Sequence, residues 1–162
     1  LWNIYVIDVF VIIFAVLITV YLGNLFTWKT TALFAVLLTG IDVIQVLLTK
    51  HMVSVSQTVT ELRLPLLIIL PVVPFNAEQG LRLMGLGLGD LFFTGLLGLQ
   101  TFREYDKRFA VLSIIGMSVS FFIFEALMLT YKISAFPGTL MILCGWLPLV
   151  LFKQLREKVV EH

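Results

Sequence analysis

The sequence predicts an all-α polytopic membrane protein that forms one membrane domain over residues 1–162. Apolar residues make up 60% of the chain and charged residues only 13%, whereas soluble domains are typically about half apolar and about a quarter charged. The mean hydropathy is +1.06. Apolar stretches recur along the chain, and each approaches the roughly 20 residues that a helix needs to cross a hydrocarbon core about 30 Å thick.

Five apolar segments are expected to be transmembrane helices: residues 1–22, 30–49, 83–101, 109–131 and 136–152. The first lacks the basic region and the cleavage site of a signal peptide. A sixth apolar run, residues 62–75, is shorter and contains three prolines. Because proline disrupts a straight helix, we expect this run to be an interfacial or extended segment that leads into the third helix.

Composition and residue spacing exclude several other classes. The single cysteine, Cys144, cannot form an internal disulfide. No group of Cys, His and acidic residues has metal-site spacing, which disfavours a metalloprotease. The membrane serines have no histidine at comparable depth to activate them, which disfavours a serine mechanism. A net charge of +1 without a basic, aromatic-rich patch gives no indication of nucleic-acid binding.

Alternating helix direction sorts the charged loops to two sides of the membrane. Seven cations fall on one side and four on the other. The first set is Lys29, Arg103, Lys107, Arg108, Lys153, Arg156 and Lys158, and the second is Lys50, Arg63, Arg82 and Lys132. The positive-inside rule therefore predicts a multi-pass protein whose C-terminus is cytoplasmic and whose long loop, residues 50–82, lies outside.

Four acidic residues interrupt the apolar segments: Asp8, Asp42, Asp90 and Glu125. An ionisable group at membrane depth costs at least a few kcal/mol and usually marks a functional site. Asp42 lies seven residues before the expected end of the second helix, and Asp90 seven residues after the expected start of the third. Each carboxyl is thus expected about 10 Å from the same membrane face. Two antiparallel helices would bring the two aspartates to one depth.

Two carboxyls in a low-dielectric site cannot both ionise cheaply, so one keeps its proton while the other acts as a base. The base takes a proton from a water that attacks a peptide carbonyl. The acid polarises that carbonyl and then protonates the leaving amine, which is aspartyl proteolysis. The same pair is also compatible with a proton or cation relay, or with carboxyls that only hydrogen-bond to the backbone.

The local motifs separate these interpretations. Asp90 ends the motif Gly87-Leu88-Gly89-Asp90, whose glycines allow close backbone approach. Asp42 follows Gly40-Ile41, Leu62-Arg63-Leu64-Pro65-Leu66 precedes the third helix, and Pro137-Gly138-Thr139 lies at the start of the fifth. Taken in chain order, with the Gly87–Asp90 motif third, these four elements resemble the presenilin and signal peptide peptidase family. That family carries catalytic aspartates on its sixth and seventh helices, the second in a GxGD motif, and a proline-alanine-leucine motif on its ninth.

The resemblance is nearest to the archaeal presenilin-like proteases and covers essentially the whole chain, which corresponds to helices five through nine of a nine-helix fold. It implies a presenilin-like helix bundle and a cofactor-free intramembrane aspartyl endopeptidase. Such an enzyme cleaves transmembrane-helix proteins or remnant signal peptides within the lipid bilayer. Homo-oligomerisation is left open. The implied catalytic residues are Asp42 and Asp90, and the implied substrate-binding residues are Gly87, Leu88, Gly89, Leu64, Pro65, Leu66, Pro137, Gly138 and Thr139.

Three positions depart from the family pattern. Ile41 replaces a tyrosine before the first aspartate, Thr94 stands where many members have proline, and only Pro137 of the proline-alanine-leucine motif is kept. A non-catalytic relative and a proton- or ion-coupled transporter therefore remain as alternatives. The GxGD prepilin peptidases are a weaker match, because an apolar run, Leu91-Phe92-Phe93, follows Asp90 where they carry a polar stretch.

Overall fold

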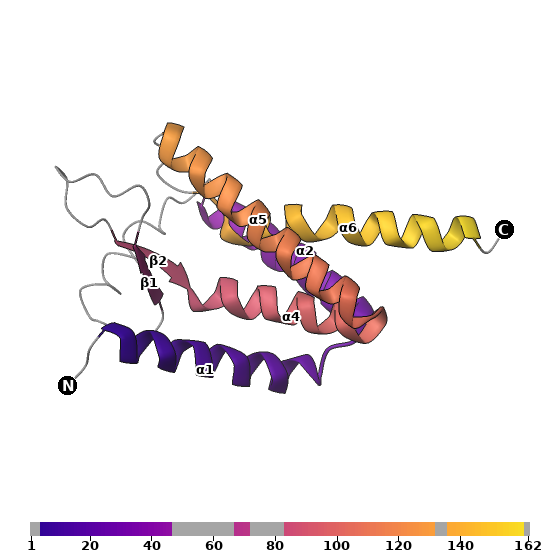
Figure 1. The fold of residues 1–162 in the computed structure, drawn as a ribbon, viewed down its shortest axis with the longest axis horizontal. Helices are drawn as coiled ribbons and strands as arrows, with labels where there is room; N and C mark the ends of the chain where they lie inside the picture. The colour runs from indigo at the N-terminus through magenta and orange to yellow at the C-terminus, as the bar shows by residue number, and fades with distance from the viewer. Residues whose placement is uncertain (1–3, 47–66, 72–82, 132–135, 161–162) are drawn as a thin grey trace.

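The computed structural model describes residues 4–46, 67–71, 83–131 and 136–160. Within these residues the fold is mainly helical, with a small two-stranded antiparallel sheet at one end of the bundle (Figure 1). The helices are α1 (Ile4–Gly23), α2 (Trp28–Ile44), α4 (Leu88–Glu104), α5 (Lys107–Tyr131) and α6 (Gly138–Val160), and the strands are β1 (Leu67–Pro71) and β2 (Leu83–Gly87).

Helix α4 is the centre of the bundle. It packs against α1, α2, α5 and α6, and Phe93, Leu96 and Leu97 on it are completely buried. The outer helices instead leave large apolar side chains exposed, such as Leu17 on α1 and Phe122 on α5 (61% and 74% exposed). An apolar exterior of this extent is stable in contact with lipid rather than with water.

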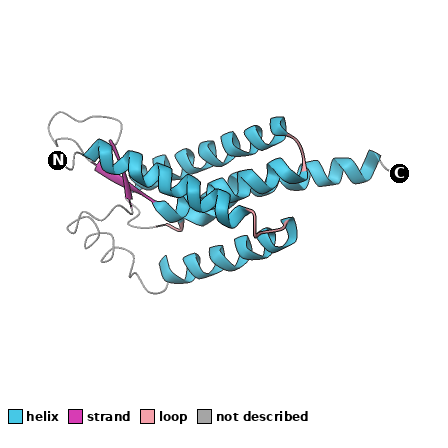
Figure 2. Cartoon of the chain, turned by 90° about the horizontal axis from the view of Figure 1, so that it is seen from below, coloured by secondary structure: helices cyan, strands magenta, loops and turns pink. Residues whose placement is uncertain are grey.

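Two helices within the described residues are long and apolar enough to cross a membrane. They contain the stretches Lys107–Met128 and Gly138–Val159, each of 22 residues, with mean hydropathies of 2.1 and 1.5. Helix α1 contains a shorter apolar stretch, Asp8–Gly23. The bundle thus has the composition of a membrane protein, seen from below in Figure 2 as roughly aligned helices with the strands at one end.

The end of the bundle farthest from the sheet is held together by polar contacts to the backbone. The Gln100 amide donates hydrogen bonds to the carbonyl oxygens of Gly23 and Phe26 (2.8 and 3.0 Å). Arg103 also donates to the Gly23 carbonyl (2.5 Å). Because these carbonyls lie at and beyond the end of α1, where helix acceptors have no internal partner, the side chains of α4 fix the α1–α2 turn. Thr27 then starts α2 with a capping box.

The predicted start of the third helix, at residue 83, is wrong. Residues 83–87 form β2, and α4 begins at Leu88. Each glycine costs about 1 kcal/mol in a helix interior, and β2 contains Gly85 and Gly87. Antiparallel pairing with β1, from Leu67 opposite Gly87 onward, satisfies the backbone instead. The part of the proline-containing segment that the structure describes, residues 67–71, is extended.

Helices α5 and α6 cross at very close range. A Cβ atom built on Gly145 of α6 would overlap the backbone of Gly116 on α5, at 2.8 Å from its carbonyl carbon. Nearer the start of α6, the Ser120 hydroxyl donates to the carbonyl of Met141 (2.7 Å). Small residues at such crossings let membrane helices approach closely and gain van der Waals contact. This crossing fixes where α6 begins relative to the rest of the bundle.

Gly145→Ala is expected to destabilise the bundle by about 1–3 kcal/mol, because the added methyl meets backbone atoms that cannot rotate away. Thermal unfolding in detergent would measure this as a lower Tm. Gly40→Ala is the matched control, because a Cβ at Gly40 meets no atom within 4 Å. An equal Tm for Gly145→Ala and the unmodified protein would contradict the close crossing.

Candidate active site

Asp42 lies in the last turn of α2, two residues before Ile44, and is buried (8% exposed). Its Oδ2 atom accepts two hydrogen bonds from one residue of α6. The Thr139 hydroxyl donates at 2.6 Å, and the Thr139 backbone N–H donates at 3.2 Å. These bonds join positions 97 residues apart in the chain. The carboxyl group of Asp42 therefore has a defined orientation toward the start of α6.

Asp90 lies in the first turn of α4, two residues after Leu88, and is partly buried. Its carboxyl group packs against glycine backbone. A Cβ atom built on Gly138 would lie 2.7 Å from Oδ1 and 3.0 Å from Oδ2 of Asp90, and one built on Gly87 would lie 3.3 Å from Oδ2. The missing side chain at Gly138 thus leaves the space that the Asp90 carboxyl occupies.

The two carboxyl groups meet at one turn of α6. Asp42 bonds to Thr139 and Asp90 packs on Gly138, and consecutive Cα atoms are only about 3.8 Å apart. The predicted offset of seven residues between Asp90 and the start of its helix is wrong, because α4 begins at Leu88, two residues before Asp90. The predicted end of the second helix, residue 49, lies outside the described residues.

The residues that begin α6 are themselves firmly held. Pro137 is buried, and its carbonyl accepts the first hydrogen bond of the helix, from the Met141 N–H (3.3 Å). The ring of Phe136 stacks on Phe124 of α5 at 5.3 Å between centroids. Since the first N–H groups of a helix have no internal acceptor, the Thr139 N–H is free to bind the Asp42 carboxyl. The resemblance implies only a substrate-binding role for Thr139. A polar residue in the first turn of an apolar helix was the sequence signal that could have indicated its contact with a buried acid.

The other predicted substrate-binding residues fall into two groups. Gly87 ends β2 and is the N-cap of α4, Leu88 is partly buried, and Gly89 is exposed, with open space where a side chain would be. The three residues Leu64, Pro65 and Leu66 lie outside the described residues. Within the described part, the Gly87–Gly89 corner therefore lies beside Asp90 and leaves its backbone accessible.

The remaining marked residues lie away from this turn or face outward. Ile41 is 53% exposed, so its side chain points away from the helix interfaces although it precedes Asp42. Thr94 lies one turn beyond Asp90 on α4 and is partly buried. Asp8 and Glu125 are partly buried on α1 and α5. The position of Ile41 shows that a residue adjacent to Asp42 in sequence need not contact the carboxyl pair.

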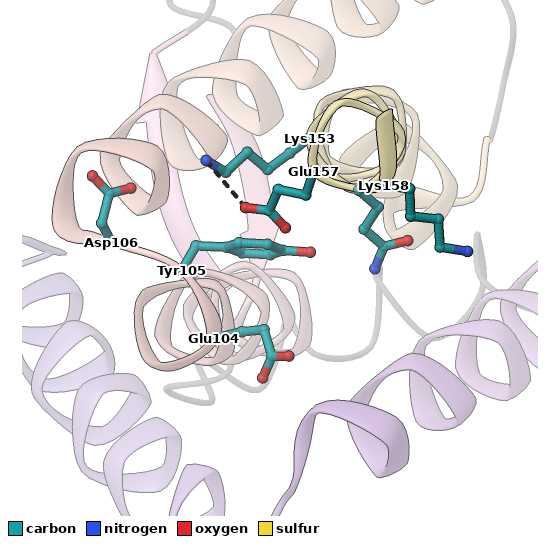
Figure 3. Close-up of a pocket in the computed structure, with 7 residues that line it drawn as sticks. Glu104, Tyr105, Asp106, Lys153, Glu157 and Lys158 are labelled. Atoms are coloured by element: carbon teal, nitrogen blue, oxygen red, sulfur yellow. Dashed lines mark ion pairs between the residues drawn. The ribbon is translucent and has the colours of Figure 1, made fainter. Parts of the chain in front are cut away.

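A separate open cavity of about 650 Å³ lies at the opposite end of α4 (Figure 3). Glu104 on its wall is 14 residues from Asp90, about 20 Å along the helix. Lys153 and Glu157 form an ion pair across one α6 turn (3.3 Å). The pKa of Tyr105 is raised, mainly by burial and also by the nearby Glu157 and Glu104 carboxylates. A hydrogen bond with Gln154 lowers this pKa and offsets part of the increase. This polar cavity is thus distinct from the aspartate pair.

Comparison with known protein families identifies one family for this chain. The family model described as signal-peptide peptidase, presenilin aspartyl protease matches residues 2–97. These residues make up more than half of the chain and include both Asp42 and Asp90, whereas the Pro137–Thr139 turn lies beyond them. No curated protein and no solved structure matches the chain. The chain belongs to the signal-peptide peptidase and presenilin aspartyl protease family.

Proposed function

We propose that this protein is an intramembrane aspartyl endopeptidase that cleaves transmembrane segments or remnant signal peptides, with Asp42 and Asp90 as its catalytic pair. The observation that carries the proposal is the convergence of both carboxyl groups on consecutive residues of α6. Buried carboxyls are costly in a membrane protein unless they pair or act. The family match over both aspartates supports a proteolytic role for this pair.

The proposed reaction consumes one water molecule for each peptide bond. The ionised carboxyl takes a proton from the water as its oxygen bonds to the carbonyl carbon, while the protonated carboxyl donates to the carbonyl oxygen. The resulting tetrahedral intermediate carries two hydroxyl groups. Its C–N bond then breaks as the departing nitrogen receives a proton from the pair and one of the two hydroxyls returns its proton to the pair. The products are a carboxylic acid and an amine, and the pair again holds one proton.

We further propose that all five described helices cross the bilayer, that the aspartate pair lies within it, and that the C-terminus is in the cytoplasm. Helix α4 alone spans about 26 Å, from its 17 residues at 1.5 Å each. The preceding strand β2 adds length to this crossing. Support for the outer helices comes from their exposed apolar faces. Asp90, at the junction of β2 and α4, would then lie below the surface of the hydrocarbon core.

The sheet beside Asp90 is suited to hold an extended substrate. Among the described residues, β1 and β2 form a two-stranded sheet in which the outer edge of each strand faces no described partner strand. In a membrane the backbone groups of such an edge need a partner, and a substrate segment unwound from its helix has the same need. We propose that the Leu64–Pro71 segment, the Gly87–Gly89 corner and the Pro137–Thr139 turn hold the substrate backbone, with a substrate strand adding to the sheet.

Asp42→Asn and Asp90→Asn are each expected to reduce cleavage of a transmembrane peptide by at least about a hundredfold, because each removes one member of the acid–base pair. Purified full-length protein in lipid vesicles would be incubated with the peptide, and products identified by mass spectrometry. Glu125→Gln is the matched control, since it neutralises a partly buried carboxyl on a different helix, α5.

The outcomes separate the alternatives. Cleavage that persists in either aspartate variant would contradict the assignment of the pair. An unmodified protein that does not cleave but carries an acid-dependent ion flux would favour the transporter. Neither activity, in a protein that remains folded, would favour the non-catalytic relative.

Gly138→Ala is expected to reduce cleavage by about tenfold or more while leaving Tm nearly unchanged. The added methyl would lie 2.7 Å from Asp90 Oδ1. The carboxyl can rotate away without disturbing the fold, but it then leaves its position beside Asp42. Rates and Tm would be compared with those of Gly40→Ala, whose added methyl meets no neighbour. Full activity in Gly138→Ala would argue that Asp90 reacts from a different position.

A further inference from the structure

We propose that Thr139 is a positioning residue that holds the negative charge on Asp42, so that Asp42 is the general base and Asp90 carries the shared proton. The proposal rests on the proposed proteolytic function and deepens it, because that function requires one ionised and one protonated carboxyl without saying which is which. It follows from the different surroundings of the two carboxyl groups.

Asp42 has the surroundings of a carboxylate. Both donors of Thr139 point to the same oxygen, Oδ2. A backbone N–H can only donate, so this oxygen acts as an acceptor. The hydroxyl distance of 2.6 Å is within the range of a charge-assisted O–H···O⁻ hydrogen bond.

Asp90 has the surroundings of a carboxylic acid. Its carboxyl packs against Gly138 and Gly87, and glycines supply no side-chain donor. Its position beside the ionised Asp42 disfavours a second negative charge. The proton shared by the pair is therefore held on Asp90.

Other charged groups on the helices that pack against α2 are far from Asp42. Those helices are α4 and α6, and in their described residues the nearest charge to Asp42 is Asp90. Arg103 and Glu104 lie about 20 Å away along α4, and a similar length of α6 separates Thr139 from its charged C-terminal half. That half carries Lys153, Arg156, Glu157 and Lys158. Among the groups that the structure describes, Thr139 is therefore the one that distinguishes Asp42 from Asp90.

The test compares Thr139→Val, which removes the hydroxyl at nearly constant volume, with Thr139→Ser, which retains it. The acid limb of the pH profile of kcat/KM is expected to move about one unit to higher pH in Thr139→Val, because the Asp42 carboxylate loses one of its two donors. Thr139→Ser is expected to restore the profile. Thr31→Val is the matched control, since Thr31 is a fully buried threonine of α2 whose hydroxyl has no hydrogen bond.

The outcomes also distinguish this proposal from the proposed function. An active protein whose pH profile is the same in Thr139→Val as in the unmodified protein would overturn the role of Thr139 and leave the protease assignment intact. Failure of the protease assignment would give a different result, because the unmodified protein itself would then show no cleavage. A lower kcat/KM at every pH, with no shift of the acid limb, would indicate a merely structural role and would also overturn the proposal.

A second measurement does not depend on how Thr139 variants fold. Infrared difference spectra at neutral pH would be recorded for Asp42→Asn and Asp90→Asn. The band of a protonated carboxyl group is expected to be lost in Asp90→Asn and retained in Asp42→Asn. The opposite pattern would assign the proton to Asp42 and overturn the proposal.

Discussion

The contact between the first turn of α6 and two carboxyl groups is the constraint on which the rest of the structure depends. Thr139 bonds to Asp42 and Gly138 packs on Asp90, so three helices must bring their ends to one point. A hydroxyl and a backbone N–H at a helix start are suitable donors for a buried carboxylate, because no intrahelical acceptor competes for the N–H. An apolar bundle can then contain two acids, because at least one of the carboxyl groups, that of Asp42, receives hydrogen bonds.

The packing of the bundle serves this convergence. Helix α4 is enclosed by its neighbours, which fixes the direction in which Asp90 enters the site. The close crossing at Gly116 and Gly145 fixes α6 against α5, and the stacked rings of Phe124 and Phe136 hold the chain just before Pro137. Because the contact surfaces are backbone and small side chains, a shift of α6 would require several contacts to break together.

The glycines before Asp90 allow both an extended strand and a helix start within a few residues. Residues 83–87 pair with β1, and the chain then turns into α4 at Gly87. An unpaired strand edge is a liability in lipid, and it is also a surface on which another extended segment can be bound. The same local sequence thus accounts for the position of the acid and for the exposed backbone beside it.

The sequence by itself determined the membrane class and the family, and it predicted that Asp42 pairs with Asp90. These depend on composition and on short motifs, which are local properties of the chain. It did not determine that residues 83–87 are a strand. These residues are extended because they pair with β1, and such pairing between distant segments cannot be read from the local sequence. Only the tertiary structure decided that Thr139 donates to Asp42 across 97 residues and that Gly138 leaves room for Asp90. A polar threonine at the start of an apolar helix is a local signal for a role of Thr139, but the partner of Thr139 and the space at Gly138 depend on how the helices cross, which the local sequence does not specify.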